Sequence, residues 1–377
     1  MSILIGADFV PTKSNYELFE SGNVTELVGE ELIKEFASVD YRLFNFEVPL
    51  TDSGTPIIKS GPSLKAPKAT ISGYKALNIN VATLANNHIL DQGEQGLCDT
   101  LKVLKENSIG HVGAGMNLAE SKDAYVIQHK GMSVAVYSCA EHEFSIATDN
   151  AAGANPYDPL ESFDAVEELK NVHDFVIVLY HGGKEYYRYP SPELQRRCRK
   201  FVEKGANLVI CQHSHCIGCE EKYHSGTIVY GQGNFLFDDS DDECWRTGLL
   251  IRINDDFSIT YIPVIKQGNL VRKADREKAA EIIEAFDKRS LEIQTAGFIQ
   301  RKYEELADTM LPYYLAQFRG IRGSNIVYRV LNKLTHKRWR NFYVSKKYGS
   351  GQKTTILNNI QCEAHQELIL AGLRKRR

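Results

Sequence analysis

The distribution of apolar and polar positions divides the chain into a region that alternates strands with helices and a region of helices alone. Apolar runs typical of buried strands stand at 3–5, 41–46, 81–84, 175–180 and 208–211. Between them, apolar residues recur at helical spacing over 24–36, 67–77, 96–107, 160–170 and 192–204. This alternation predicts a layered α/β domain.

The pattern changes near residue 270. Residues 249–253 and 259–264 read as a hairpin that turns at Asn254, Asp255 and Asp256. From residue 275 to 310, Glu, Lys, Ala and Ile recur at helical spacing, and residues 311–377 are basic and aromatic. We therefore expect an α/β domain over 1–270 and a helical, basic C-terminal extension over 271–377.

Composition indicates an ordinary globular protein. Hydrophobic residues make up 43% of the 377 residues and charged residues 25%, and the net charge of −3 gives no whole-chain signal for nucleic acid. No run approaches the roughly 18 apolar residues of a transmembrane helix. The N-terminus also lacks the basic start and long apolar stretch of a signal peptide. We expect a cytoplasmic protein with no transmembrane segment, in which the eight cysteines are mostly thiols.

The charge is unevenly distributed. Residues 310–377 contain 14 Lys and Arg against two Asp and Glu, so the rest of the chain is acidic. The segments 336–343 and 374–377 mix or concentrate basic and aromatic residues, which could bind an anionic polymer, a membrane surface or nucleic acid. The plainer interpretation, a solvated helical face and a frayed terminus, is preferred.

Side chains with catalytic or metal-binding chemistry follow five of the strand-like runs. In open α/β sheets, ligands bind beyond the carboxyl ends of the strands, so we expect these side chains to meet in one site. They are Asp8, Glu47, Asn87, His88, His181, His213 and His215.

The types of these residues suit a metal centre. Carboxylates, amide oxygens and imidazoles bind Mn, Fe or Zn, and one carboxylate can bridge two ions that activate water and hold a phosphoryl or carbonyl oxygen. If the strand continues, His213 and His215 stand at alternate positions and their rings point the same way. Each residue alone has a structural alternative: Asp8 as a cap, Asn86 and Asn87 as turn residues, a histidine in the core. Their joint occurrence favours the metal centre.

Seven stretches of the sequence carry a family resemblance. They are IGADF at 5–9, NFEVPLTDSGTP at 45–56, LANNHILDQGEQGL at 84–97, GHVGAGMNLAES at 110–121, YHGGKEYYRYPSPELQ at 180–195, GANLVICQHSHC at 205–216 and YGQGNFLFD at 230–238. In this order and spacing the chain resembles the CapA family of poly-γ-glutamate capsule synthesis proteins, whose fold is similar to the calcineurin-like metallophosphoesterases. The resemblance reaches to about residue 265, and residues 275–377 lie outside it.

The resemblance implies an α/β/β/α sandwich of the metallophosphoesterase type and a role for each residue. His88 is implied as the acid that protonates the leaving group, and Glu47 as the carboxylate that bridges two metals. The other implied metal ligands are Asp8, Asn87, His181, His213 and His215. Groups that support these ligands or face the substrate are Asp91, Glu185 and Asn234. The wider phosphoesterase pattern has a histidine where this chain has Val10, and an aspartate where it has Glu47. Because of these departures, the resemblance does not fix the number of metals, which is one or two, or their identity, which is Mn, Fe or Zn.

The implied function is that of a metal-dependent hydrolase or transferase. Its bond is a phosphoester or a γ-glutamyl (acyl) bond in the synthesis of a capsule or another surface polymer. The substrate is then an anionic polymer or its precursor, the partners are other polymer-synthesis proteins, and no specific nucleic acid is expected. The alternative is a non-catalytic, metal-containing accessory protein that binds an anionic polymer or precursor. The presence of His88 beside Asn87 favours catalysis, because a binding site alone does not need an acid.

Two further motifs have plainer interpretations. Cys211, Cys216 and Cys219 could hold a structural zinc, but no fourth ligand stands at the usual spacing, so ordinary thiols are favoured. The Gly231–Gly233 stretch lacks the pattern of a dinucleotide loop, and we expect a tight turn near the metal centre instead.

Overall fold

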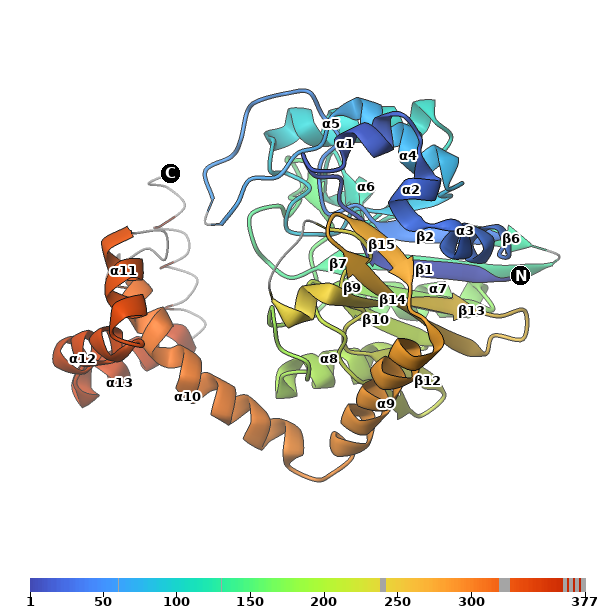
Figure 1. The fold of residues 1–377 in the computed structure, drawn as a ribbon. Helices are drawn as coiled ribbons and strands as arrows, with labels where there is room; N and C mark the ends of the chain where they lie inside the picture. Colours follow the sequence, from blue (N-terminus) through green and yellow to red (C-terminus); the bar gives the residue numbers. More distant parts are fainter. Residues whose placement is uncertain are drawn as a thin grey trace. The chain divides into compact units, whose positions relative to one another are not determined.

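The computed structural model describes residues 1–59, 61–129, 131–237, 242–318 and 326–361, together with residues 365, 369 and 373. The chain forms two compact units, residues 1–299 and residues 300–377. In the first unit, two β-sheets pack face to face and helices cover their outer faces (Figure 1). The predicted α/β/β/α sandwich is thereby confirmed.

The first sheet has seven strands in the order β15-β14-β13-β1-β2-β3-β4. Its parallel half consists of β1 (Ile3–Asp8), β2 (Tyr41–Asn45), β3 (Val81–Thr83) and β4 (Gly110–Val112). Its antiparallel half consists of β13 (Thr247–Ile253), β14 (Ile259–Gln267) and β15 (Leu270–Lys273). The predicted hairpin is confirmed, since Ile253 of β13 lies opposite Ile259 of β14.

The second sheet has six strands in the order β11-β12-β10-β9-β7-β6. Four central strands are parallel: β7 (Met132–Ala140), β9 (Phe175–His181), β10 (Leu208–Gln212) and β12 (Gly226–Val229). The edge strands β6 (Tyr125–His129) and β11 (Glu220–Tyr223) are antiparallel to their neighbours. A two-stranded sheet pairs β5 (Ala114–Gly115) with β8 (Gly153–Ala154).

Alternation along the strands produces the layers of the core. In β1, Ile3 and Ile5 pack between the two sheets against β9 and β10 residues such as Ile177 and Ile210, whereas Leu4 packs under the helices. Both faces of central strands such as β1, β9 and β10 are therefore buried, which is why these strands read as continuous apolar runs.

Most helices of the first unit cover the two outer faces (Figure 1). The first sheet is covered by α1 (Tyr16–Glu20), α2 (Val24–Val28), α3 (Glu30–Ala37), η1 (Lys68–Thr70), α4 (Ile71–Ala76) and α5 (Gly93–Glu106). The second sheet is covered by α7 (Ser162–Val172) and α8 (Pro192–Glu203). The short helices α6 (Leu118–Lys122) and η2 (Glu243–Arg246) lie in connections.

The single helix predicted over residues 24–36 is wrong, because the structure contains two helices there. Gly29 has φ +80°, a left-handed conformation that ends α2 and that glycine adopts without strain. Arg272 from β15 donates hydrogen bonds to the carbonyls of Glu26 and Leu27 at the end of α2. These contacts satisfy carbonyls that a continuous helix would have paired internally.

The C-terminal unit is helical, as the sequence predicts. It contains all but the first two residues of α10 (Phe298–Phe318), together with α11 (Ile326–Leu334), α12 (Arg338–Lys347) and α13 (Ser350–Gln361). The expected boundary at residue 270 precedes α9 (Arg276–Glu292), which packs on β14 and β11 and groups with the first unit. Among the described residues, no helix has the length and apolar character needed to cross a membrane.

Candidate metal centre

The strand ends that carry the predicted site residues belong to two sheets rather than one. β1, β2 and β3 of the first sheet lead to Asp8, Glu47 and the Asn87–His88 pair. β9 and β10 of the second sheet lead to the histidines at 181, 213 and 215. All seven side chains are buried, and the metal-ligand candidates among them converge between the ends of the sheets.

An irregularity in β1 positions Asp8. The register between β1 and β2 shifts between Gly6 and Asp8, so that Asp8 lies opposite Asn45. Gly6 allows this close approach, because a Cβ atom there would lie 2.0 Å from the ring of Phe44. The Nδ2 atom of Asn45 donates to Oδ1 of Asp8 at 2.7 Å, which leaves Oδ2 directed at the Nδ1 atom of His215, 3.4 Å away.

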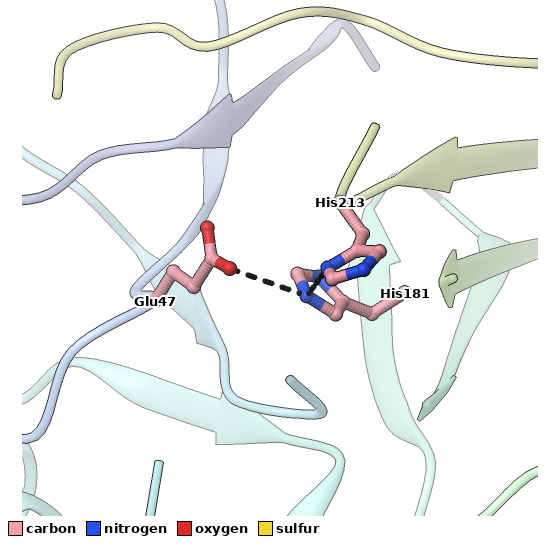
Figure 2. Close-up of side chains that lie close together, drawn as sticks. All are labelled: Glu47, His181 and His213. Carbon is pink, nitrogen blue, oxygen red and sulfur yellow. Dashed lines mark hydrogen bonds and ion pairs between the residues drawn. The ribbon is translucent and has the colours of Figure 1, made fainter. Parts of the chain in front are cut away.

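A first group of ligand atoms surrounds the Nε2 atom of His181. Oδ1 of Asn87 lies 3.0 Å from this nitrogen, Nδ1 of His213 lies 3.2 Å away, and Oε1 of Glu47 lies 3.4 Å away. Figure 2 shows the carboxylate of Glu47 facing the imidazoles of His181 and His213. A proton on Nε2 of His181 can form a hydrogen bond with only one of these three neighbours. A single cation can accept a lone pair from each neighbour and from His181 itself, four donors in all.

A second group contains Asp8, Glu47 and His215, with one ligand atom of each lying within 4.8 Å of the others. The same limit holds for Glu47, His181 and His213. Glu47 belongs to both groups, which is the geometry that a bridging carboxylate requires.

His213 and His215 do not continue the strand, so the condition under which their rings would point the same way is not met. β10 ends at Gln212, and the two histidines have φ of +87° and +55°, in a left-handed turn. Their rings therefore do not point the same way from an extended strand. His213 joins the group around His181, and His215 joins the group around Asp8.

Burial sets the charge of the imidazoles and carboxylates. It lowers the pKa of His181 to about 3, and burial beside two other imidazoles lowers the pKa of His213 well below its usual value. Both rings are therefore neutral at pH 7, with lone pairs to offer. Burial and the charge of Asp8 raise the pKa of Glu47 well above its usual value. Burial also raises the pKa of Asp8, but the contact with His215 outweighs it and the pKa falls to about 2.

These residues fit divalent cations. Among the described residues, Oδ2 of Asp8 and both carboxylate oxygens of Glu47 are buried without a hydrogen-bond partner, a costly arrangement that a cation would relieve. Neutral imidazole, amide and carboxylate donors suit Mn, Fe or Zn. The group around His181 offers four donors and the group around Asp8 offers three. Val10 is buried in the core beneath the helices and supplies no ligand.

The predicted acid, His88, lies beside the first group and is held by two charged residues. Its Nδ1 atom lies 2.6 Å from Oδ2 of Asp91, and the other carboxylate oxygen of Asp91 lies 2.6 Å from Nζ of Lys59. Lys59 Nζ is also 3.3 Å from Nδ1 of His88 and from the backbone oxygen of Asn87. Asp91 therefore orients the ring and leaves its Nε2 atom for a substrate.

Sequence reasoning missed three residues of the centre: Lys59, Asn45 and Glu143. Glu143 accepts a hydrogen bond from Nδ2 of Asn87 at 3.0 Å, which turns the amide oxygen of Asn87 toward His181. Glu143 follows the end of β7 at Ala140 by three residues, and this strand is not among the apolar runs from which the site was predicted. Lys59 lies in a connection with no periodic signal.

The two remaining candidates lie on the side of His215. The Nδ1 atom of His215 lies 2.9 Å from Oδ1 of Asn234, and its ring stacks on Trp245 with centroids 4.7 Å apart. Glu185 is half-buried, and its negative charge contributes to raising the pKa values of Glu47 and His215.

The cysteines and glycines of the two further motifs contribute to packing and to a turn. Cys211 and Cys219 pack in the core between the second sheet and α7 and α8, where Sγ of Cys211 lies 3.5 Å from Sγ of Cys198. Gly231 and Gly233 have φ of +141° and +71°, in the turn that leads to Asn234. The last residue of the 230–238 motif and the cysteine at 362 lie outside the described residues.

The fold and the centre define a layered α/β protein with a buried cluster of carboxylate, amide and imidazole side chains. Residues 4–239 match the family described as bacterial capsule synthesis protein PGA_cap, and the chain belongs to that family.

Relatives of the chain carry names from polymer synthesis. It is 31% identical over 223 residues to the capsule biosynthesis protein CapA of Bacillus anthracis, covering 57% of this chain and 54% of that one. It is 30% identical over 224 residues to the PGA biosynthesis protein CapA of Bacillus subtilis (strain 168), covering 57% and 59%. A probable polyglutamine synthesis accessory protein of Mycobacterium tuberculosis is 28% identical, covering 56% and 59%. The chain thus spans little more than half the length of these relatives.

Solved structures similar to the chain include a novel phosphatase from Mycoplasma pneumoniae, with TM-score 0.45 and 12% identity over 71% of this chain and 94% of that one. A putative 5'-nucleotidase from Staphylococcus aureus has TM-score 0.42 and 12% identity, covering 76% of this chain and 58% of that one. Likeness at this level carries no argument about chemistry.

Proposed function

We propose that the protein is a divalent-metal-dependent hydrolase or transferase that cleaves a phosphoester or a γ-glutamyl (acyl) bond. Its substrate is an anionic polymer or a precursor of one, in cytoplasmic steps of capsule or surface-polymer synthesis alongside other synthesis proteins. The observation that carries the proposal is His88, held by Asp91 beside a buried set of ligands whose described carboxylate oxygens include three without a hydrogen-bond partner. The names of the relatives support the polymer.

Two groups of side chains would hold the cations. Glu47, Asn87, His181 and His213 form the group with four donors, and Asp8, Glu47 and His215 form the other. Divalent cations bound there supply Lewis acidity toward a phosphoryl or carbonyl oxygen and lower the pKa of water.

The chain's own residues supply the proton and the charge. His88 donates a proton from Nε2 to the leaving group, while Asp91 accepts the hydrogen bond from Nδ1 and fixes the ring. Lys59 pairs with Asp91 and adds a buried positive charge next to His88, which favours an anionic substrate.

A second candidate is a binding function without turnover. The relative in Mycobacterium tuberculosis is named as an accessory protein, which favours a role in holding the polymer for another enzyme. In that role the ligands would bind cation and polymer, and replacing His88 would change binding rather than a rate.

The test is turnover of an aryl phosphate and of a γ-glutamyl anilide by Mn-loaded wild-type protein and His88→Asn. His224→Asn is the matched control, because His224 is exposed, lies outside the centre and has a positive φ that asparagine adopts. We expect a loss of about 100-fold or more in kcat for His88→Asn and none for the control. Polymer binding without turnover of either probe would support the accessory role, and turnover that His88→Asn leaves unchanged would contradict the acid assigned here.

A further inference from the structure

The C-terminal unit carries positive charge without any compensating acid over a long stretch. Residues 309–362 contain ten Lys and Arg and no Asp or Glu. Four of these cations, Arg329, Lys333, Lys337 and Arg340, line one cavity of about 660 Å³ together with Tyr313 and Tyr328. Within the described part of the chain, Nε of Arg340 is buried without a hydrogen-bond partner. The cavity is therefore built for an anion.

The same region presents apolar side chains to solvent. α11 buries Tyr328 in the small core of the unit, against residues such as Leu315 and Val344. Its opposite face exposes Ile326, Val327, Val330 and Leu334, and the side chains at its two ends, Ile326 and Leu334, are 75% and 74% exposed. Helical spacing places these four residues in one stripe.

Charge and apolar surface are adjacent on α11. Arg329 and Lys333 are one turn apart, and helical spacing places them along one border of the apolar stripe. Ile326 and Val330 line the same cavity as the cations. On α12, Phe342 is exposed and Nζ of Lys346 lies 5.8 Å from its ring centroid. The surface therefore combines aliphatic and aromatic side chains with flanking basic ones.

This combination selects among ligands. A polyanion in solution would neutralise the cations but leave the aliphatic stripe in water, and a second copy of the chain would bring like charges together. An anionic bilayer satisfies both features, because the apolar stripe enters the acyl boundary while Lys and Arg stay at the level of the phosphates.

We propose that α11, with Lys337 and Arg340, is a peripheral membrane-binding surface for anionic phospholipids. The lipid phosphates lie in the basic cavity, and Ile326, Val330 and Leu334 insert beside them. This inference is independent of the catalytic proposal, because every residue that carries it lies within residues 300–377.

Co-sedimentation of the full chain with vesicles tests the proposal. The vesicles contain equal parts of phosphatidylglycerol and phosphatidylcholine, or phosphatidylcholine alone. The apolar variant is Ile326→Ser/Val330→Ser/Leu334→Ser, and its matched control is Leu160→Ser/Val172→Ser, two similarly exposed aliphatic residues (79% and 71%) of the first unit. The charge variant is Lys333→Glu/Lys337→Glu, and its control is Lys13→Glu/Lys105→Glu, at exposed positions outside the surface.

We expect the wild type and both controls to sediment with the anionic vesicles and not with the neutral ones. The apolar and charge variants should each bind at least tenfold more weakly, with gel filtration and circular dichroism unchanged. Equal binding to neutral vesicles would overturn the proposal. It would also fail if only the charge variant lost binding, since that result describes a site for a soluble polyanion. A dimer in solution that the apolar variant abolishes would assign the stripe to a second copy and overturn it as well.

Discussion

The Nδ1 atom of His88 lies 2.6 Å from Oδ2 of Asp91, three residues further along the chain. The side chain of Asp91 also accepts from Nζ of Lys59 and from the backbone nitrogen of Leu64, both at 2.6 Å. One buried carboxylate therefore fixes the ring of the proposed acid and the connection that carries Lys59. This relationship links the order of a loop to the chemistry of the centre.

Replacing Asp91 by Asn should lower kcat about 10- to 100-fold while bound metal stays at the wild-type level. The amide can still accept from Leu64, but it no longer stabilises a positive charge on His88. Steady-state kinetics with parallel metal analysis measure both quantities. Asp174→Asn is the control, because Asp174 pairs with Ser133 just before β9, far along the strand from His181. Loss of metal in Asp91→Asn would instead show a structural role.

Replacing Glu143 by Ala should weaken metal binding about tenfold or more, since Glu143 orients the amide of Asn87. Without this acceptor, the amide oxygen no longer faces Nε2 of His181 consistently. Calorimetric titration with Mn measures the affinity, and Glu168→Ala, at an exposed position on α7, is the control. An affinity equal to that of the wild type would remove Glu143 from the account.

The pKa of Glu47 predicts how the stability of metal-free protein depends on pH. Burial and the charge of Asp8 raise this pKa above its unfolded value of 4.5. A carboxyl group raised in the folded state contributes stability that is complete below the unfolded pKa and is lost as pH rises toward the folded pKa. The Glu47→Gln variant has no group that titrates at this position, so its stability does not show this loss. In the presence of a chelator, the variant should therefore become more stable relative to the wild type as pH rises above 4.5. The ratio of the two unfolding equilibrium constants should change by at most about tenfold per pH unit.

Added Mn should make the wild type more stable than Glu47→Gln. The cation stabilises the ionised carboxylate of the wild type, whereas the amide of the variant binds the cation weakly. Urea denaturation across pH, with and without Mn, makes the comparison. Parallel pH profiles for the two proteins in chelator would contradict the environment assigned to Glu47.

Replacing Gly6 by Ala should lower the free energy of unfolding by about 1–3 kcal/mol and weaken metal binding. The added Cβ would meet the ring of Phe44 at 2.0 Å, beside the irregularity in β1 that positions Asp8. Gly54→Ala is the control, since a Cβ there meets nothing within 4 Å. Denaturant unfolding measures the difference, and equal stability of the two variants would contradict the packing argument.

Much of the fold was accessible from the sequence because the central strands are buried on both faces and read as continuous apolar runs. The hairpin of β13 and β14 followed from the same pattern and a polar turn. Periodicity failed at Gly29, where the contact of Arg272 with the end of α2 comes from a strand more than 200 residues away. A local pattern does not contain such a contact.

The expectation that ligands bind beyond the carboxyl ends of strands identified the candidate residues that follow a strand. It could not show that these strands belong to two sheets. The argument from alternate positions does not apply to His213 and His215, because nothing in their spacing indicates that β10 ends at Gln212. The position of a residue after a strand could not identify Lys59, because tertiary contacts with Asp91 place this lysine in the centre. The terminal basic segment 374–377 lies outside the described residues.

The central claim is that these buried ligands hold a divalent metal, and metal analysis of the purified chain tests it most directly. Wild-type protein, Asp8→Asn/His213→Asn and His224→Asn are loaded with Mn, passed through gel filtration and analysed for bound metal. Asparagine preserves the size of Asp8 and tolerates the positive φ of His213. The account predicts one or two bound ions per chain in the wild type and in His224→Asn, and none in the double variant. A wild type without metal, or a double variant that keeps it, would contradict the account.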